Sequence, residues 1–400
     1  MKKIVLILLL FLLSMLASLL ALRACAPESA GSVPTPEYHY ASPTPSPTPT
    51  PSPSPSPTAE ELRLERAQEI LASMTTHEKV CQLFILRPEA LTGAAFTDDP
   101  EAWRSALEAY PVGGIFFAAN NLSGMDGTTS AIAVMQSASA LPLFIAVDEE
   151  GGNVARLAST LGTTTFSPMY NYRSEGAATA YENALTIAGD ISALGFNLDF
   201  APVADVWTNP ANTVIGTRAY SDDPEEAAAL VAAAVEGFSN GGVLTVLKHF
   251  PGHGDTAEDS HFGLATNGKS LDELYDCELK PFIAGMEAGA DMVMTAHILL
   301  PQLDAENPAT LSYAVTTELL RGELGFDGVI ITDALEMGAL AGYTDAEIAV
   351  RAIEAGADLL LSPVDPAAAI EAVTREISPE RLDESVLRIL QLKLKKGIIV

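Results

Sequence analysis

The sequence predicts an α/β protein built on a (β/α)8 barrel of the TIM type, and two observations lead to this fold class. From Ala59 onward, short apolar runs rich in β-branched and aromatic residues alternate with longer stretches of helical period, which is typical of parallel βα units. Eight such runs can be counted, the number of strands in a closed parallel barrel. A doubly wound open sheet is the alternative, because a strand count does not prove closure.

The eight predicted strands are short, mostly apolar and bounded by turn-forming residues. They are Cys81–Leu86, Gly114–Ala118, Leu143–Val147, Asn197–Ala201, Leu244–Lys248, Met292–Ala296, Gly328–Thr332 and Asp358–Leu361. The predicted helices include Glu60–Ser73, Ala227–Ser239, Ser270–Glu287, Asp345–Ala355 and Pro379–Lys396. In this scheme Cys81 is a buried thiol of the first strand, and Cys277 lies on a helix face.

The segment 1–25 is predicted to be a signal sequence or a membrane anchor. Lys2 and Lys3 precede an almost purely apolar run from Ile4 to Leu22, as in an export signal. The four residues that end at Cys25 resemble the lipobox of bacterial lipoproteins, although Arg23 replaces the usual small residue. We therefore expect export and attachment at the cell surface, through lipid on Cys25 or through an uncleaved apolar helix. Release from the cell is the third alternative.

The segment 26–58 is predicted to be a Pro/Ser/Thr-rich disordered linker. Residues 42–58 read SPTPSPTPTPSPSPSPT, and proline at every second position excludes a helix and favours an extended, semi-rigid spacer. At roughly 3.1 Å per residue, this spacer and the residues before it can hold a domain up to about 100 Å from a membrane. Residues 59–400 then form the single catalytic domain, which we expect to be a monomer.

Charge and cysteine content exclude several classes of protein. The chain has 52 acidic and 22 basic residues, a net charge of −30, and its first 58 residues contribute only two acidic and three basic side chains. The acidity therefore belongs to the folded part, which has no basic surface for nucleic acid. Three cysteines without a paired spacing do not make a disulfide framework or a structural zinc site.

Titratable residues follow five of the eight predicted strands. In a parallel barrel, the residues at the carboxyl ends of the strands meet on one rim, where catalytic groups lie. Any one of these side chains alone is explained by a structural polar role, but together they indicate a site. They are Asp148, Asp205, Lys248, His249, His297 and Asp333.

The loop after the fifth strand, KHFPGHGDTAEDSH, concentrates this chemistry, with three histidines and two aspartates within 13 residues. A metal site is one interpretation, but these histidines lack the helical i, i+4 spacing of a metallohydrolase. We favour acid/base chemistry, in which Asp259 orients His261 so that the imidazole donates and then removes a proton. Asp333, at the tip of the seventh strand, supplies a carboxylate nucleophile. A nucleophile and an acid/base group are the minimum for a retaining glycosidase.

With this loop, the sequence resembles the β-N-acetylhexosaminidases of glycoside hydrolase family 3. Three further motifs occur in the family's order, and the resemblance covers residues 62–400. They are DEEGGNVAR from Asp148 to Arg156, IGTR from Ile215 to Arg218, and ITDALEM from Ile331 to Met337. Asn153 departs from the basic residue that is common in the first motif.

The resemblance implies a role for each matching residue. Asp333 is the nucleophile, His261 the proton donor and acceptor, and Asp259 its partner. The positions implied to bind the sugar in the −1 subsite are Asp148, Arg156, Arg218, Lys248 and His249.

The expected activity is that of an exo-acting retaining β-N-acetylhexosaminidase, with a covalent glycosyl-enzyme and without a metal or organic cofactor. Its expected partner is an N-acetylglucosamine-containing oligosaccharide or muropeptide. Family members that hydrolyse β-glucosides commonly take an acid/base glutamate from a second, C-terminal domain, which we do not expect after this barrel. The alternatives are a phosphorolytic β-N-acetylglucosaminidase, a β-glucosidase, and a non-catalytic wall-binding lipoprotein.

Overall fold

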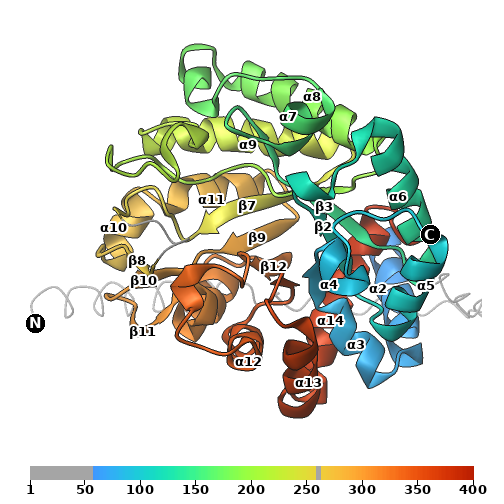
Figure 1. Ribbon diagram of the computed structural model, residues 1–400. Helices are drawn as coiled ribbons and strands as arrows, with labels where there is room; N and C mark the ends of the chain where they lie inside the picture. The colour runs from blue at the N-terminus through green and yellow to red at the C-terminus, as the bar shows by residue number, and fades with distance from the viewer. Residues whose placement is uncertain (1–56, 258–262) are drawn as a thin grey trace, which may run out of the picture. The chain divides into compact units, whose positions relative to one another are not determined.

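A computed structural model describes residues 57–257 and 263–400 of the chain. Its main sheet has eight parallel strands in the order β12-β9-β7-β6-β3-β2-β1-β13. A parallel bridge between Ile331 and Leu359 joins the two ends of this sheet, and the N–H of Thr332 donates to the Leu359 carbonyl at 3.0 Å. The sheet therefore curves round into a nearly closed barrel with helices on the outside (Figure 1). The predicted fold class is confirmed, and the open-sheet alternative is wrong.

All eight predicted strands are present. Their residues are buried along their whole length, because helices cover the outer face and side chains fill the interior. The strands are β1 (Phe84–Leu86), β2 (Gly114–Phe117), β3 (Phe144–Val147), β6 (Leu198–Asp199), β7 (Leu244–Phe250), β9 (Met292–Thr295), β12 (Val329–Thr332) and β13 (Leu360–Leu361).

The outer helices begin at side-chain caps that the sequence encodes locally. Thr58 opens α2 with a capping box to Glu61, and Asp223 caps α9 ahead of a proline at the first helical position. The α-helices are α2 (Ala59–Ser73), α3 (Thr76–Gln82), α4 (Pro88–Thr92), α5 (Pro100–Ala109), α6 (Gly124–Ala138), α7 (Arg156–Leu161), α8 (Ala177–Ala193), α9 (Pro224–Asn240), α10 (Leu271–Asp276), α11 (Leu279–Glu287), α12 (Asp345–Ala355), α13 (Pro366–Glu376) and α14 (Pro379–Lys395). A π-helical segment, η5, covers Ala314–Glu323.

Two predictions of secondary structure are wrong. Cys81 belongs to helix α3 and not to the first strand, which begins three residues later at Phe84. The single helix expected over Ser270–Glu287 is two helices, α10 and α11, separated at Cys277. Pro281 explains the break, because its ring clashes with the carbonyl four residues earlier, that of Cys277.

Short additional strands follow the carboxyl ends of the barrel strands. A hairpin of β4 (Glu149–Gly151) and β5 (Val154–Ala155) comes directly after β3. Its turn needs glycine at Gly151 and Gly152, whose φ angles are 86° and 58°. A second small sheet joins β8 (Ala265–Thr266), β10 (Ile298–Leu300) and β11 (Asp304–Pro308).

The predictions for the first 56 residues lie outside the described residues. They concern the signal or anchor of residues 1–25, lipid on Cys25, and most of the linker 26–58. Helix α2, the first described helix, starts at Ala59. In the described part of the chain, no helix combines the length and apolarity needed to span a bilayer.

Candidate active site

A cavity of about 720 Å³ lies at the carboxyl ends of the barrel strands. Residues from the ends of β1, β2, β3, β7 and β12 line it, so widely separated parts of the chain meet there. Its charged and histidine side chains are Arg87, Asp148, Glu150, Arg156, Arg218, Lys248, His249, His253, Asp333 and Glu336.

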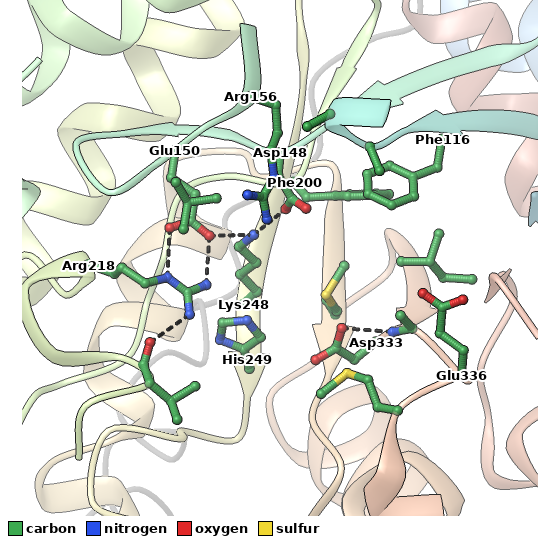
Figure 2. A pocket seen from close by; sticks show the side chains of 18 of the residues that line it. Phe116, Asp148, Glu150, Arg156, Phe200, Arg218, Lys248, His249, Asp333 and Glu336 are labelled. Carbon is green, nitrogen blue, oxygen red and sulfur yellow. Dashed lines mark hydrogen bonds and ion pairs between the residues drawn. The ribbon is translucent and has the colours of Figure 1, made fainter. Parts of the chain in front are cut away.

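Lys248, on β7, forms the centre of one wall of this cavity. Its Nζ lies 2.7 Å from Asp148 Oδ1 and 2.7 Å from Glu150 Oε1, and the residue is only 2% exposed (Figure 2). Burial alone would lower the pKa of Lys248, but the two carboxylates outweigh burial and hold the pKa above its usual value. The ammonium group is therefore charged and pre-positioned as a hydrogen-bond donor.

Glu150 links this lysine to Arg218. The Arg218 guanidinium donates to both oxygens of Glu150, with Nε–Oε2 2.9 Å and Nη2–Oε1 2.7 Å. A third bond, from Nη1 to the Val214 carbonyl at 2.9 Å, fixes the plane of the guanidinium. Burial would raise the pKa of Glu150, but Arg218 and Lys248 lower it to about 2. Glu150 lines the cavity, and the sequence analysis did not select it, although it lies two positions after Asp148 in the same motif.

His249 is oriented by a buried carboxylate behind it. Asp205 Oδ2 lies 2.7 Å from His249 Nδ1, and Asp205 Oδ1 accepts the backbone N–H groups of His249 and His253 at 3.2 and 2.7 Å. Burial would raise the pKa of Asp205, but His249 and His253 hold the pKa below its usual value. The ionised Asp205 accepts from His249 Nδ1, which leaves Nε2 as the ring nitrogen available to a ligand.

Asp333 follows directly after β12 and has access to the same cavity. Its Oδ1 accepts the backbone N–H of Ala334 at 2.7 Å. Burial would raise the pKa of Asp333, but His249, His297, this hydrogen bond and Lys248 together hold the pKa below its usual value. The carboxylate is therefore ionised at neutral pH, as a nucleophile requires.

Two of the predicted rim residues, Asp205 and His297, do not line the cavity. His297 is fully buried, with Nδ1 2.8 Å from Thr310 Oγ1 and Nε2 3.0 Å from the Ala334 carbonyl. His297 thus supports the turn that carries Asp333.

The opposite wall of the cavity contains residues that the sequence analysis did not select. Arg87, which follows β1, is ion-paired to Glu336 with Nη2–Oε1 2.5 Å, and its guanidinium lies 5.7 Å from the centre of the Phe116 ring. Arg87 directly follows a predicted strand and Glu336 lies within the ITDALEM motif, so position along the chain contained a signal for both.

The structure thus brings six predicted site residues into one cavity and says nothing of two others. The six are Asp148, Arg156, Arg218, Lys248, His249 and Asp333. Asp259 and His261 lie outside the described residues. Within residues 57–257 and 263–400, no three His, Cys, Asp or Glu side chains are arranged to hold a metal ion.

Comparisons with known proteins agree with this geometry. A model of the "Glycosyl hydrolase family 3 N terminal domain" matches residues 75–392. A curated relative, Beta-hexosaminidase A of Pseudoalteromonas piscicida, is 37% identical over 346 residues, which cover 77% of this chain and 58% of that protein. Beta-hexosaminidase of Stenotrophomonas maltophilia (strain K279a) is 37% identical over 280 residues, which cover 68% of this chain and 82% of that protein.

Solved structures show the same fold. A glycoside hydrolase family 3 β-N-acetylglucosaminidase from Paenibacillus sp. str. FPU-7 has a TM-score of 0.76 and 41% identity, covering 82% of this chain and 63% of that chain. A β-glucoside phosphorylase has a TM-score of 0.75 and 28% identity, covering 84% and 62%. The chain therefore spans less than two thirds of the length of several of these proteins.

Proposed function

The chain belongs to glycosyl hydrolase family 3, and we propose that it is a retaining β-N-acetylhexosaminidase that removes terminal β-linked N-acetylglucosamine from peptidoglycan fragments or chito-oligosaccharides. The observation that supports this most is the ionised Asp333 carboxylate in the same cavity as the charged cluster around Lys248. Curated relatives named as β-hexosaminidases favour this activity over the others in the family.

The cavity wall formed by Lys248, Asp148, Glu150 and Arg218 is suited to an uncharged sugar. Each sugar hydroxyl is both a donor and an acceptor, so it is best bound between a cation and a carboxylate. Lys248 and Asp148 offer such a pair, held 2.7 Å apart before a sugar arrives. Arg156, Arg218 and His249 complete the proposed −1 subsite, and the hydrogen bonds among the charged groups lower the cost of ordering them on binding.

In the proposed reaction, Asp333 attacks the anomeric carbon as the glycosidic bond breaks, through an oxocarbenium-like transition state. His261, oriented by Asp259, donates a proton to the leaving oxygen, and a covalent glycosyl-enzyme forms on Asp333. His261 then removes a proton from water, which attacks the anomeric carbon and releases the sugar with net retention. The roles of Asp259 and His261 rest on the resemblance of their motif to the family pattern.

Phosphorolysis is the second candidate function. Phosphate would replace water in the second step, and a neutral histidine repels this anion less than a carboxylate would. A solved β-glucoside phosphorylase with the same fold makes this alternative worth testing.

The test compares release of p-nitrophenol from β-N-acetylglucosaminide and β-glucoside substrates by the full chain, with and without phosphate. We expect release from the acetamido sugar only, and a fall in kcat on the order of 10⁴-fold or more for Asp333→Asn, because the nucleophile is lost. Asp327→Asn is a matched control, since this exposed aspartate precedes β12 at the opposite end of the strand. Equal activity on the glucoside would refute the proposed specificity, and acceleration by phosphate would favour phosphorolysis.

A second comparison tests the acid/base assignment. His261→Ala should impair substrates with poor leaving groups more than those with good ones, because a poor leaving group needs the proton most. Equal losses on both would argue against His261 as the acid.

For the segments that precede the barrel, we propose export and attachment to the cell surface. The supporting features are the apolar run after Lys3 and the lipobox-like residues that end at Cys25. Cys25→Ala should release a lipid-anchored protein from membranes, whereas unchanged membrane recovery would favour an apolar helix as the anchor.

A further inference from the structure

Arg156 lines the cavity, and within residues 57–257 and 263–400 no side-chain partner holds it there. It is the first residue of helix α7, and Figure 2 shows its side chain beside Asp148. Among the described residues, no carboxylate forms an ion pair with its guanidinium, in contrast to Arg218. The position of Arg156 therefore depends on the position of the backbone that carries it.

Glu149 holds that backbone. Its Oε2 accepts the N–H of Leu157 at 2.7 Å, and its Oε1 accepts the N–H of Ala158 at 3.0 Å. The first N–H groups of a helix have no partners within the helix, and Ala155, at the N-cap position, has no side-chain oxygen to accept them. Glu149 supplies this cap from the neighbouring strand of the hairpin and is only 3% exposed.

The cap is itself attached to the barrel. The backbone N–H of Glu149 donates to Oδ1 of Asp199 at 2.9 Å, and Asp199 lies on β6 with no exposed surface. The β4–β5 hairpin pairs Glu149 with Ala155, the residue just before the helix. A continuous path of hydrogen bonds thus runs from the barrel wall through Glu149 to the first turn of α7.

We propose that Glu149 is a positioning residue for sugar binding, which acts by capping helix α7 and so holding Arg156 in the cavity. Glu149 is not among the residues that line the cavity, so it acts through Arg156 and not by contact with the sugar. This inference rests on the proposed function, because it assumes that Arg156 binds the sugar.

The electrostatic surroundings of Glu149 add a second readout. Burial raises the pKa of Glu149 to about 7, against the lowering effect of the two backbone N–H groups and Arg156, while Asp190 on α8 raises it further. Asp199 on β6 is a second carboxyl group that faces Glu149. Protonation removes one of the two acceptors of the cap. The affinity of the wild type for the sugar should therefore weaken as the pH falls from about 8 to about 6.

The experiment measures calorimetric binding of N-acetylglucosamine to the full chain and to variants, with thermal melting as a check of folding. Glu149→Ala should raise Kd about 10-fold at pH 8, because two hydrogen bonds to a charged acceptor are lost. The double variant Glu149→Ala/Arg156→Ala should bind no more weakly than Arg156→Ala alone, since both changes remove the same interaction. Glu149→Gln keeps one acceptor, so we expect a smaller loss and a Kd that no longer depends on Glu149 titration.

Asp365→Ala is the matched control. Asp365 is also a carboxylate cap, the N-cap residue of α13, where it accepts the Ala368 N–H at 3.0 Å, and α13 contributes no residue to the cavity. Its loss should lower the melting temperature without changing Kd.

The outcomes separate this inference from the proposed function. If the wild type neither binds N-acetylglucosamine nor cleaves its β-glycosides, the proposed function is wrong. If the wild type binds and a folded Glu149→Ala binds equally well, or if its effect adds to that of Arg156→Ala, the positioning role is wrong. Should Glu149→Ala fail to fold, a Glu149→Gln variant with the pH dependence of the wild type would refute the role.

Discussion

Two buried lysines at opposite ends of the barrel differ in what surrounds them. Lys248 lies at the carboxyl ends of the strands between two carboxylates, Asp148 and Glu150, each 2.7 Å away. Lys393, on helix α14, lies at the amino ends of β1, β2 and β3. Its partners among the described residues are neutral: it donates to Gln82 Oε1 at 3.1 Å and to the Gly113 carbonyl at 3.0 Å, and its Nζ lies 4.8 Å from the centre of the Phe144 ring.

The same side chain has opposite pKa shifts in these two places. Burial opposes the charged form in both, but the carboxylates beside Lys248 outweigh it, whereas burial lowers the pKa of Lys393 to about 7. Burial alone therefore does not mark a functional group. The counter-charges identify the end of the barrel that maintains a charged, ordered site for a ligand.

The largest effect is expected from removing the charge of Lys248, at the carboxyl ends of the strands. Lys248→Met leaves the carboxylate of Asp148 without its partner and Glu150 with only Arg218, so we expect a loss of about 3–5 kcal/mol in the free energy of unfolding. Activity should fall to background because the sugar loses a donor. Urea denaturation measures the loss of stability, and kcat/KM measures the loss of activity. Lys79→Met, which removes a partly exposed pair with Asp383, is the control and should cost no more than about 1 kcal/mol. Similar losses for both variants would contradict the comparison.

A smaller effect is expected from replacing Asp205, the carboxylate that orients His249. In Asp205→Asn, the amide group can donate to His249 Nδ1, which would place the ring proton on Nε2 instead. We expect kcat/KM to fall about 10- to 100-fold, the range for a lost hydrogen bond to a charged group. A lower melting temperature with unchanged kinetics would limit Asp205 to a structural role.

The smallest effect on activity is expected from replacing Lys393, at the amino ends of the strands. Lys393→Met should change kcat/KM by less than about 2-fold, because Lys393 does not line the cavity. The contribution of Lys393 to the free energy of unfolding should instead depend on pH. Between about pH 7 and pH 10 the unfolded chain keeps a proton on Lys393 that the folded chain releases, so this residue makes the free energy of unfolding rise with pH.

The measurement is urea denaturation of the wild type and of Lys393→Met at pH 7, 8 and 9. As the pH rises, the free energy of unfolding of the wild type should increase relative to that of Lys393→Met by at most about 1.4 kcal/mol per pH unit. Parallel pH profiles would show that Lys393 stays charged in the folded protein.

Much of the fold was predictable because the signals are local. Each strand is a short apolar run, and caps such as Thr58 and Asp223 mark where helices begin. The errors arose where neighbours decide the local conformation. Cys81 continues an apolar run and still belongs to helix α3, which ends only where the chain enters the barrel wall.

The site was predictable to a different degree on each wall of the cavity. Asp148, Lys248, His249 and Asp333 end strands, so barrel geometry brings them together once the strands are recognised. Arg87 follows a strand and Glu150 lies in the motif of Asp148, so their positions were a signal that the analysis did not use. Nothing in the spacing of the chain indicates their partners, Glu336 for Arg87 and Arg218 for Glu150.

The sequence by itself determined the residue types, the strand ends on which they lie, and the family to which the chain belongs. Only the tertiary structure decided which carboxylate faces which cation, and therefore which groups are ionised. The pKa of Lys248, Lys393, Glu149 or Asp333 depends on charges and burial contributed by distant segments, within distances of a few ångströms that spacing along the chain does not specify.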